Sequence, residues 1–123
     1  MSLEIDRRLR AANLQAARTY VDAGFSVLIE MDLGDPWGQA TAEQVFFGTD
    51  AIRVMLICER RTAARRLENR PAAAQASALR AFDSAPWSTL TAELVVTTDD
   101  KDAVTVAAEI LASGLFSGET RPT

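Results

Sequence analysis

The 123-residue chain contains no histidine, one cysteine and one lysine. Without histidine, every mechanism that uses imidazole as a general base, proton shuttle or metal ligand is excluded. The single Cys58 cannot form an internal disulfide, and its place at the end of an apolar run indicates a small buried residue in a reducing, cytoplasmic setting. Lys101 lies among aspartates at an expected helix start, where a solvated charge is the simplest interpretation. The other cations are arginines.

Several further features are missing. No apolar run approaches the length of a membrane span, and the charged N-terminus lacks the apolar core of a signal peptide. The formal net charge of −4 does not favour nucleic acid or an anionic membrane. Zinc-ligand spacings, EF-hand loops and GxSxG are also absent. We therefore expect a cytoplasmic protein with no membrane partner, no nucleic-acid partner and no metal site of its own.

The first fifty residues suggest a helix followed by a buried strand. Apolar residues recur every three or four positions over residues 3–23, and Gly24 fits the left-handed position just past a helix end. Tyr20 and Phe25 are spaced for the apolar contact that accompanies such an end. Residues 25–29 are apolar on both faces, which predicts a strand covered on both sides.

The next helix has two possible starts. Asp35 and Pro36 suit a cap and first helical position, whereas residues 41–44 also fit a capping box. Trp37 and Trp87 each follow a proline and are expected to anchor loops on the core rather than line a ligand pocket.

The rest of the chain alternates strands with helices. The expected elements are a strand at 52–58, helices at 62–70 and 72–82, a strand at 94–97, and a last helix capped by Asp99 or Asp100 and ending at residue 112. Such alternation predicts an α/β fold: a short parallel sheet of about three strands with helices on both faces, in three layers. We expect one domain over residues 1–116 and a flexible tail at 117–123.

Open parallel sheets bind ligands beyond the carboxyl ends of their strands. This rule selects polar residues after each expected strand: Glu30 and Asp32, then Glu59 and Arg60, then Asp99 and Asp100. A carboxylate such as Glu30 or Asp32 can hold magnesium through water or accept the proton of a substrate hydroxyl. The residues alone favour a plainer interpretation, in which Glu30 and Asp32 are polar because the strand reaches solvent there.

Arginines are concentrated in the expected helix after the second strand. Arg66 and Arg70 would share a helix face with Thr62, and Arg61 and Arg65 would lie on a neighbouring stripe. Converging guanidinium groups are stabilised most by a polyanion such as a triphosphate. The alternative is a solvated helix in an arginine-rich protein.

Three segments in order, AARTYVDAGFSVLIE, RVMLICERRTAARRLENR and AELVVTTDDKDAVTVAAEIL, resemble consecutive blocks of the small P-loop kinases. The nearest groups are the chloramphenicol-phosphotransferase-like and zeta-toxin-like kinases. In that family a helix ends in Ala-Gly before a strand, a second strand precedes a lid helix with doubled arginines, and an LVVDT-like strand precedes the last helix. The resemblance covers roughly residues 13–111.

The resemblance implies roles for particular residues. Arg65, Arg66 and Arg70 would contact the phosphates of ATP, and Glu30 would lie near magnesium or the acceptor hydroxyl. The family's first strand and its GxxxxGK[ST] phosphate loop have no counterpart in the 123 residues. Independent phosphoryl transfer is therefore not expected, and any binding of ATP and magnesium is expected to be weak.

The missing strand has a structural consequence. In the family it lies between the strands that match residues 25–29 and 52–58, so its loss would leave backbone groups unpaired. We expect these two strands to pair directly, or another chain to cover the exposed edge. Two further hypotheses follow. One is a non-enzymatic interaction module that forms a homodimer through a sheet edge or helix face. The other is a kinase completed by a chain that supplies the phosphate loop.

Overall fold

The computed structural model describes residues 2–31, 36–85 and 91–116. The chain divides into two compact units, Met1–Ala51 and Ile52–Thr123, and each is described by itself. The single domain expected over residues 1–116 stays a prediction. The tail expected at 117–123, Asp32 and Trp87 lie outside the described residues.

Unit 1 is built on helix α1 (Leu3–Asp22), which closely matches the helix expected at residues 3–23. The Ser2 side chain caps it by accepting a hydrogen bond from the Ile5 amide at 3.2 Å. Gly24 has a φ of 95°, so the left-handed helix end is confirmed. The expected contact is confirmed as well: the rings of Tyr20 and Phe25 meet edge to face, 5.8 Å apart.

Helix α2 (Pro36–Val45) begins at the expected proline, and Asp35 lies outside the described residues. It packs on α1, and Leu14 and Ala17 of α1 are buried. Arg18 of α1 donates hydrogen bonds to the carbonyl oxygens of Val45 and Phe47 at 2.8 and 3.1 Å. These contacts place a cation at the carbonyl end of α2, where the helix dipole favours it.

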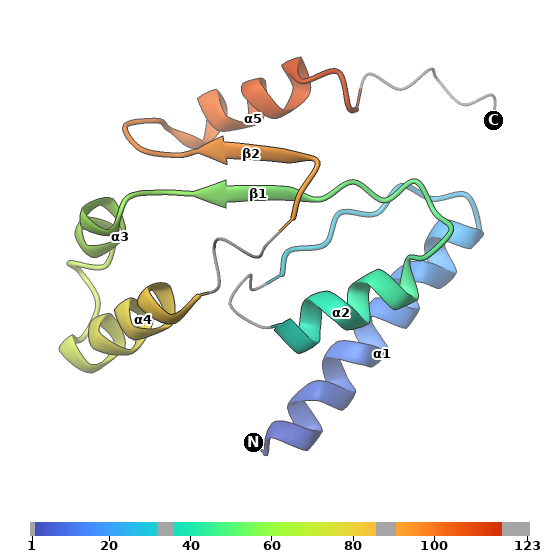
Figure 1. The fold of residues 1–123 in the computed structure, drawn as a ribbon, viewed down its shortest axis with the longest axis horizontal. Coiled ribbons are helices and arrows are strands. Elements are labelled where there is room, and N and C mark those ends of the chain that lie inside the picture. Colours follow the sequence, from blue (N-terminus) through green and yellow to red (C-terminus); the bar gives the residue numbers. More distant parts are fainter. Residues whose placement is uncertain (1, 32–35, 86–90, 117–123) are drawn as a thin grey trace. The chain divides into compact units, whose positions relative to one another are not determined.

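Unit 2 contains a parallel pair of strands, β1 (Val54–Ile57) and β2 (Leu94–Thr97), in the register Val54 to Leu94 through Ile57 to Thr97. Three helices accompany them: α3 (Arg60–Arg66), α4 (Ala72–Ser84) and α5 (Ala103–Ala112). Helix α5 packs against β2, and α3 contacts α4, as Figure 1 shows. The α/β character and the parallel pairing expected from the sequence are therefore confirmed.

The core of unit 2 is small. Met55, Val96 and Val106 are its buried apolar side chains among the described residues, and Thr62 is its buried polar one. At the opposite end of the strands from α3, Arg53 and Glu93 clamp the pair. The Glu93 carboxylate accepts hydrogen bonds from the Arg53 amide at 2.6 Å and from its guanidinium at 3.3 Å. Partial burial acts to raise the pKa of Glu93, but these hydrogen bonds outweigh it and the pKa is lowered.

Three expectations about elements are wrong. Residues 25–29 form no strand, so the sheet in the described part of the chain has two strands rather than three. An apolar run becomes a strand only when its backbone pairs with another strand, and this pairing depends on residues distant in the sequence. The helix expected at 62–70 begins at Arg60 and ends at Arg66. Pro71 disfavours helical geometry at the residue before it, which explains why Arg70 lies beyond the helix.

The third error concerns the start of α5. The helix is capped by Asp102, whose carboxylate accepts a hydrogen bond from the Thr105 amide at 2.7 Å, and not by Asp99 or Asp100. Asp100 has a φ of 56° and turns the chain between β2 and the helix. Aspartate tolerates this left-handed geometry better than most residues. Asp99 is thereby left free for a different contact.

Candidate functional site

The candidate site lies at the carboxyl ends of β1 and β2, which meet at one edge because the strands are parallel (Figure 1). Five residues form it, and we call this surface the strand rim: Glu59, Thr62, Arg66, Thr98 and Asp99. The first three follow β1 or belong to α3, and the last two follow β2. The backbone joins the two sides, since the Thr98 amide donates to the Ile57 carbonyl at 2.8 Å.

Asp99 joins the loop after β2 to the start of α3. Its two carboxylate oxygens accept hydrogen bonds from the Glu59 amide, at 3.0 and 3.2 Å, and one of them also accepts from the buried Thr62 hydroxyl. Glu59 is the N-cap residue of α3, yet its side chain makes no capping hydrogen bond. A carboxylate from the loop after β2 therefore caps the helix that follows β1.

These contacts lower the pKa of Asp99, through the Thr62 hydroxyl first, then the Glu59 amide and the charge of Arg66. A lowered pKa in the folded chain adds stability at pH values above the carboxyl pKa of the unfolded chain, about 3.9, and this contribution is lost as the pH falls through the lower folded value. We expect urea unfolding to show a steeper loss of stability below about pH 4 in the wild type than in Asp99→Asn. Two parallel pH curves would contradict this interpretation.

Arg66 fastens α3 to the loop after β2. Its guanidinium donates to the Thr98 hydroxyl at 2.9 Å and to the Thr98 carbonyl at 2.7 Å. The Thr98 hydroxyl in turn donates to the Ile57 carbonyl at 3.1 Å. Arg66 therefore lies at the carboxyl ends of both strands, as the sequence predicted for an arginine of the helix after the second expected strand.

Arg65 and Arg70, the other two arginines predicted to contact phosphate, make weaker interactions than Arg66 or none with the described residues. Arg65 is exposed, and its guanidinium lies 3.9 Å from the Asp100 carboxylate, a loose surface pair of little energetic value. Arg70 lies past the end of α3, and its guanidinium makes no hydrogen bond or ion pair with a described residue. The expectation that Arg70 shares a helix face with Thr62 and Arg66 is therefore wrong.

The two predicted carboxylates do not lie in unit 2. Glu30 is an exposed residue of unit 1 outside any helix or strand, and Asp32 lies outside the described residues. The structure therefore brings together Arg65, Arg66 and the carboxylates that follow β2, and it gives no geometry that joins them to Glu30 or Asp32.

The sequence places Glu59 and Asp99 at strand ends but does not reveal the hydrogen bond between the Glu59 amide and the Asp99 carboxylate. The parallel-strand rule could have suggested it, because both residues directly follow the expected ends of neighbouring strands. Thr62 carried no signal beyond its position in an arginine-rich segment. Its hydroxyl becomes informative only once the loop after β2 is placed beside α3.

The strand rim does not suit magnesium. Both carboxylate oxygens of Asp99 already accept hydrogen bonds. Within residues 2–31, 36–85 and 91–116, no group of three or more cysteine, aspartate or glutamate side chains could hold a metal ion. We therefore derive no step through a metal. A phosphate fits better, because guanidinium groups are the donors that phosphate oxygens prefer.

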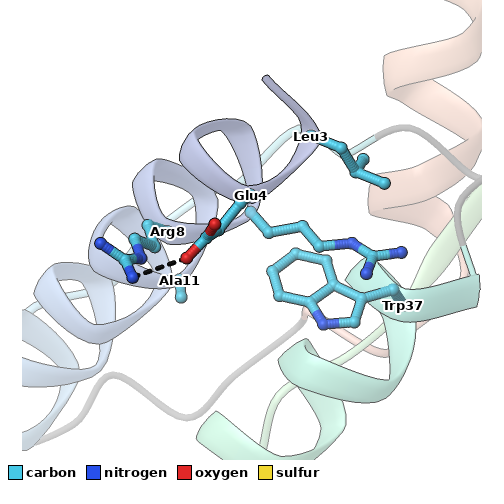
Figure 2. A pocket seen from close by; sticks show the side chains of 6 residues that line it. Leu3, Glu4, Arg8, Ala11 and Trp37 are labelled. Atoms are coloured by element: carbon cyan, nitrogen blue, oxygen red, sulfur yellow. Dashed lines mark hydrogen bonds and ion pairs between the residues drawn. The ribbon is translucent and has the colours of Figure 1, made fainter. Parts of the chain in front are cut away.

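A separate shallow pocket lies in unit 1, between α1 and the start of α2 (Figure 2). Its floor includes Trp37, and the guanidinium carbon of Arg7 lies 5.2 Å from the centre of the indole ring. Beside it, Arg8 and Glu4 form an ion pair at 2.7 Å, drawn as the dashed line in Figure 2. Because Arg7 stacks on the indole, this geometry suits an anchoring role for Trp37 better than an open ligand site.

Among the described helices, none combines the length and the apolar character that crossing a bilayer requires. Comparisons with protein-family models, curated proteins and solved structures found no match to this chain.

Proposed function

We propose that this chain is a P-loop kinase-like protein without the phosphate-binding loop, inactive in phosphoryl transfer by itself, which binds a phosphoanion such as the phosphates of ATP at the strand rim. The observation that supports it best is the position of Arg66 at the carboxyl ends of a parallel strand pair. This edge is where open α/β folds bind their ligands. The proposal includes the three-layer arrangement, and the order β1, α3, α4, β2, α5 supports it.

Arg65, Arg66 and Arg70 keep N–H donors that a ligand can use. A guanidinium has five N–H donors, and the two contacts of Arg66 with Thr98 leave others available. The weak pair between Arg65 and Asp100 can exchange for a phosphate at little cost. Arg70 has no competing ion pair within the described residues. Asp99 and Asp100 lie close by and oppose a polyanion, so we expect weak, millimolar affinity.

The absence of catalysis has its own support. The sequence contains no GxxxxGK[ST], whose backbone amides and lysine would hold the β- and γ-phosphates. Its single lysine, Lys101, forms an ion pair with Glu109 at 2.9 Å. Neither the loop nor its cation is therefore supplied by residues 1–123. A kinase completed by a second chain carrying the loop is compatible with the same strand rim.

Isothermal titration calorimetry with ATP, ADP and inorganic triphosphate tests the proposal. We expect Arg66→Ala to weaken binding about tenfold, which corresponds to about 1.4 kcal/mol. Arg66→Lys keeps the charge but loses the forked donors, so its affinity should lie between the two. Arg80→Ala, on α4, changes the net charge equally and should alter binding less than about twofold, as expected for an exposed charge.

Two outcomes would overturn the proposal. One is the absence of binding to the wild-type chain at millimolar triphosphate. The other is an equal loss in Arg66→Ala and Arg80→Ala, which would show that only net charge matters. Circular dichroism of each variant establishes that the fold is kept.

A further inference from the structure

Both outer edges of the two-stranded sheet in unit 2 lack a partner strand among the described residues, and one of these edges belongs to β1. The carbonyl oxygens of Arg53 and Ile57 accept hydrogen bonds from Leu94 and Thr98, so these residues of the first strand face β2. Backbone groups alternate in direction along a strand, which turns the amides and carbonyls of Val54 and Leu56 to the opposite edge. The described residues form a sheet of two strands only, so this edge is unpaired in them.

Within the described residues of unit 2, the free edge of β1 carries no lysine or proline and no covering strand. Natural proteins block such edges with lysine, proline, bulges or a covering element. Here the two outward-facing positions carry valine and leucine, and the Leu56 side chain is exposed. This edge therefore offers both backbone hydrogen bonds and apolar surface to an added strand.

Unit 1 carries a segment with the composition of a strand that forms no strand. Residues 25–29 (Phe-Ser-Val-Leu-Ile) form neither helix nor strand, although their apolar, partly β-branched composition favours a strand. Four large apolar side chains in this segment are exposed, and Leu28 is 98% exposed. Its five residues are enough to pair with the four residues of β1.

We propose that residues 25–29 of a second copy of this chain add to the free edge of β1, so that two copies form a reciprocal dimer. A second copy is the favoured occupant because every chain carries both an unpaired edge and an unpaired strand-like segment. In a two-fold dimer, residues 25–29 of each copy pair with β1 of the other copy, so the same contacts form twice. Both surfaces are also uncharged, so like-charge repulsion between identical chains does not oppose the pairing.

The added strand would form main-chain hydrogen bonds with β1 and cover Leu56 with apolar side chains, the usual basis of strand addition. Residues 30–53 lie between the segment and the edge, and they include the ten residues of α2. A connection of this length allows the segment to reach a neighbouring molecule, as in exchanged elements of other dimers. This dimer goes beyond phosphate binding and does not depend on it.

Light scattering coupled to size exclusion, over a concentration series, tests the proposal. We expect a species of twice the 13.3 kDa chain mass at high concentration. Leu28→Lys should raise the dimer dissociation constant at least about tenfold, because it places a charge in the added strand. Phe47→Lys exchanges another highly exposed apolar residue of unit 1 outside the segment, and should leave dimerisation unchanged.

A mixing experiment distinguishes strand addition from general apolar association. Leu56→Pro removes an outward-facing amide of β1 but leaves residues 25–29 intact, and Leu28→Lys does the reverse. We expect each variant alone to be monomeric and an equimolar mixture to form heterodimers through the one remaining intact joint. If Leu56→Pro alters the circular dichroism spectrum, Leu56→Lys serves in its place.

Hydrogen exchange gives an independent readout. Alternate amides of residues 26–29, together with those of Val54 and Leu56, should become protected as the concentration rises, since pairing removes them from solvent. A monomer at all concentrations would overturn the proposal, and protection of residues 25–29 in that monomer would mean that its own chain covers them. A dimer that survives both Leu28→Lys and Leu56→Pro would also overturn it.

Discussion

Replacement of Val96 by aspartate is expected to unfold unit 2. Val96 lies in the middle of β2, is only 4% exposed, and belongs to a core with two other buried apolar side chains among the described residues. A carboxylate there has no cation to pair with inside the core, so burial costs at least about 3 kcal/mol. Small domains are stable by about 5–15 kcal/mol, and a core this small suggests a value near the lower limit. Urea unfolding followed by circular dichroism measures the loss.

The neighbouring residue provides the control. Val95 lies in the same strand but is 47% exposed, because alternate side chains of a strand point to opposite faces. Val95→Asp has the same change in charge and in strand propensity, and should cost about 1 kcal/mol or less. Equal destabilisation by the two substitutions would contradict the burial that distinguishes them.

The second large effect is expected in unit 1. Leu14 is 4% exposed in α1, where this helix packs on α2. Truncation to alanine removes buried methyl groups and leaves a cavity, which costs about 2–4 kcal/mol. We expect amide hydrogen exchange of α1 and α2 to accelerate accordingly in the full chain, because the free energy of opening this helix pair falls.

Leu9→Ala is the matched substitution for this test. Leu9 belongs to the same helix but is 51% exposed, so its truncation leaves no cavity and should cost below about 1 kcal/mol. Equal acceleration in α1 and α2 in both variants would contradict the difference in burial between Leu14 and Leu9, because alanine does not lower helix propensity at either position.

The elements that the sequence predicted well are those with local signals. The bounds of α1 follow from a helical period that ends at Gly24, and those of β2 from three apolar residues followed by Thr97. The parallel pairing follows from the alternation of strands and helices, because parallel neighbours need a long crossover. Each of these features depends on residues near in sequence or on a general rule of topology.

The features that were missed depend on contacts between distant residues. Residues 25–29 have the composition of a strand, yet they pair with no described segment of the chain. Asp99 or Asp100 was expected to cap α5, but the Glu59 amide and Thr62 hydroxyl engage the Asp99 carboxylate, and Asp102 takes the cap instead. Aspartates only three residues apart, with similar local preferences, cannot be assigned to different helices without tertiary structure.

The hydrogen bond that caps α3 can form only after Asp99 has been synthesised. Glu59 leaves the ribosome 40 residues ahead of Asp99, the acceptor of its amide proton. At typical elongation rates this interval is roughly 2–8 s, during which α3 exists without its cap. A short, uncapped helix of seven residues is unstable in water, so the arginines of α3 stay conformationally free until β2 has been synthesised. The strand rim therefore forms only after Thr98 and Asp99 have been synthesised.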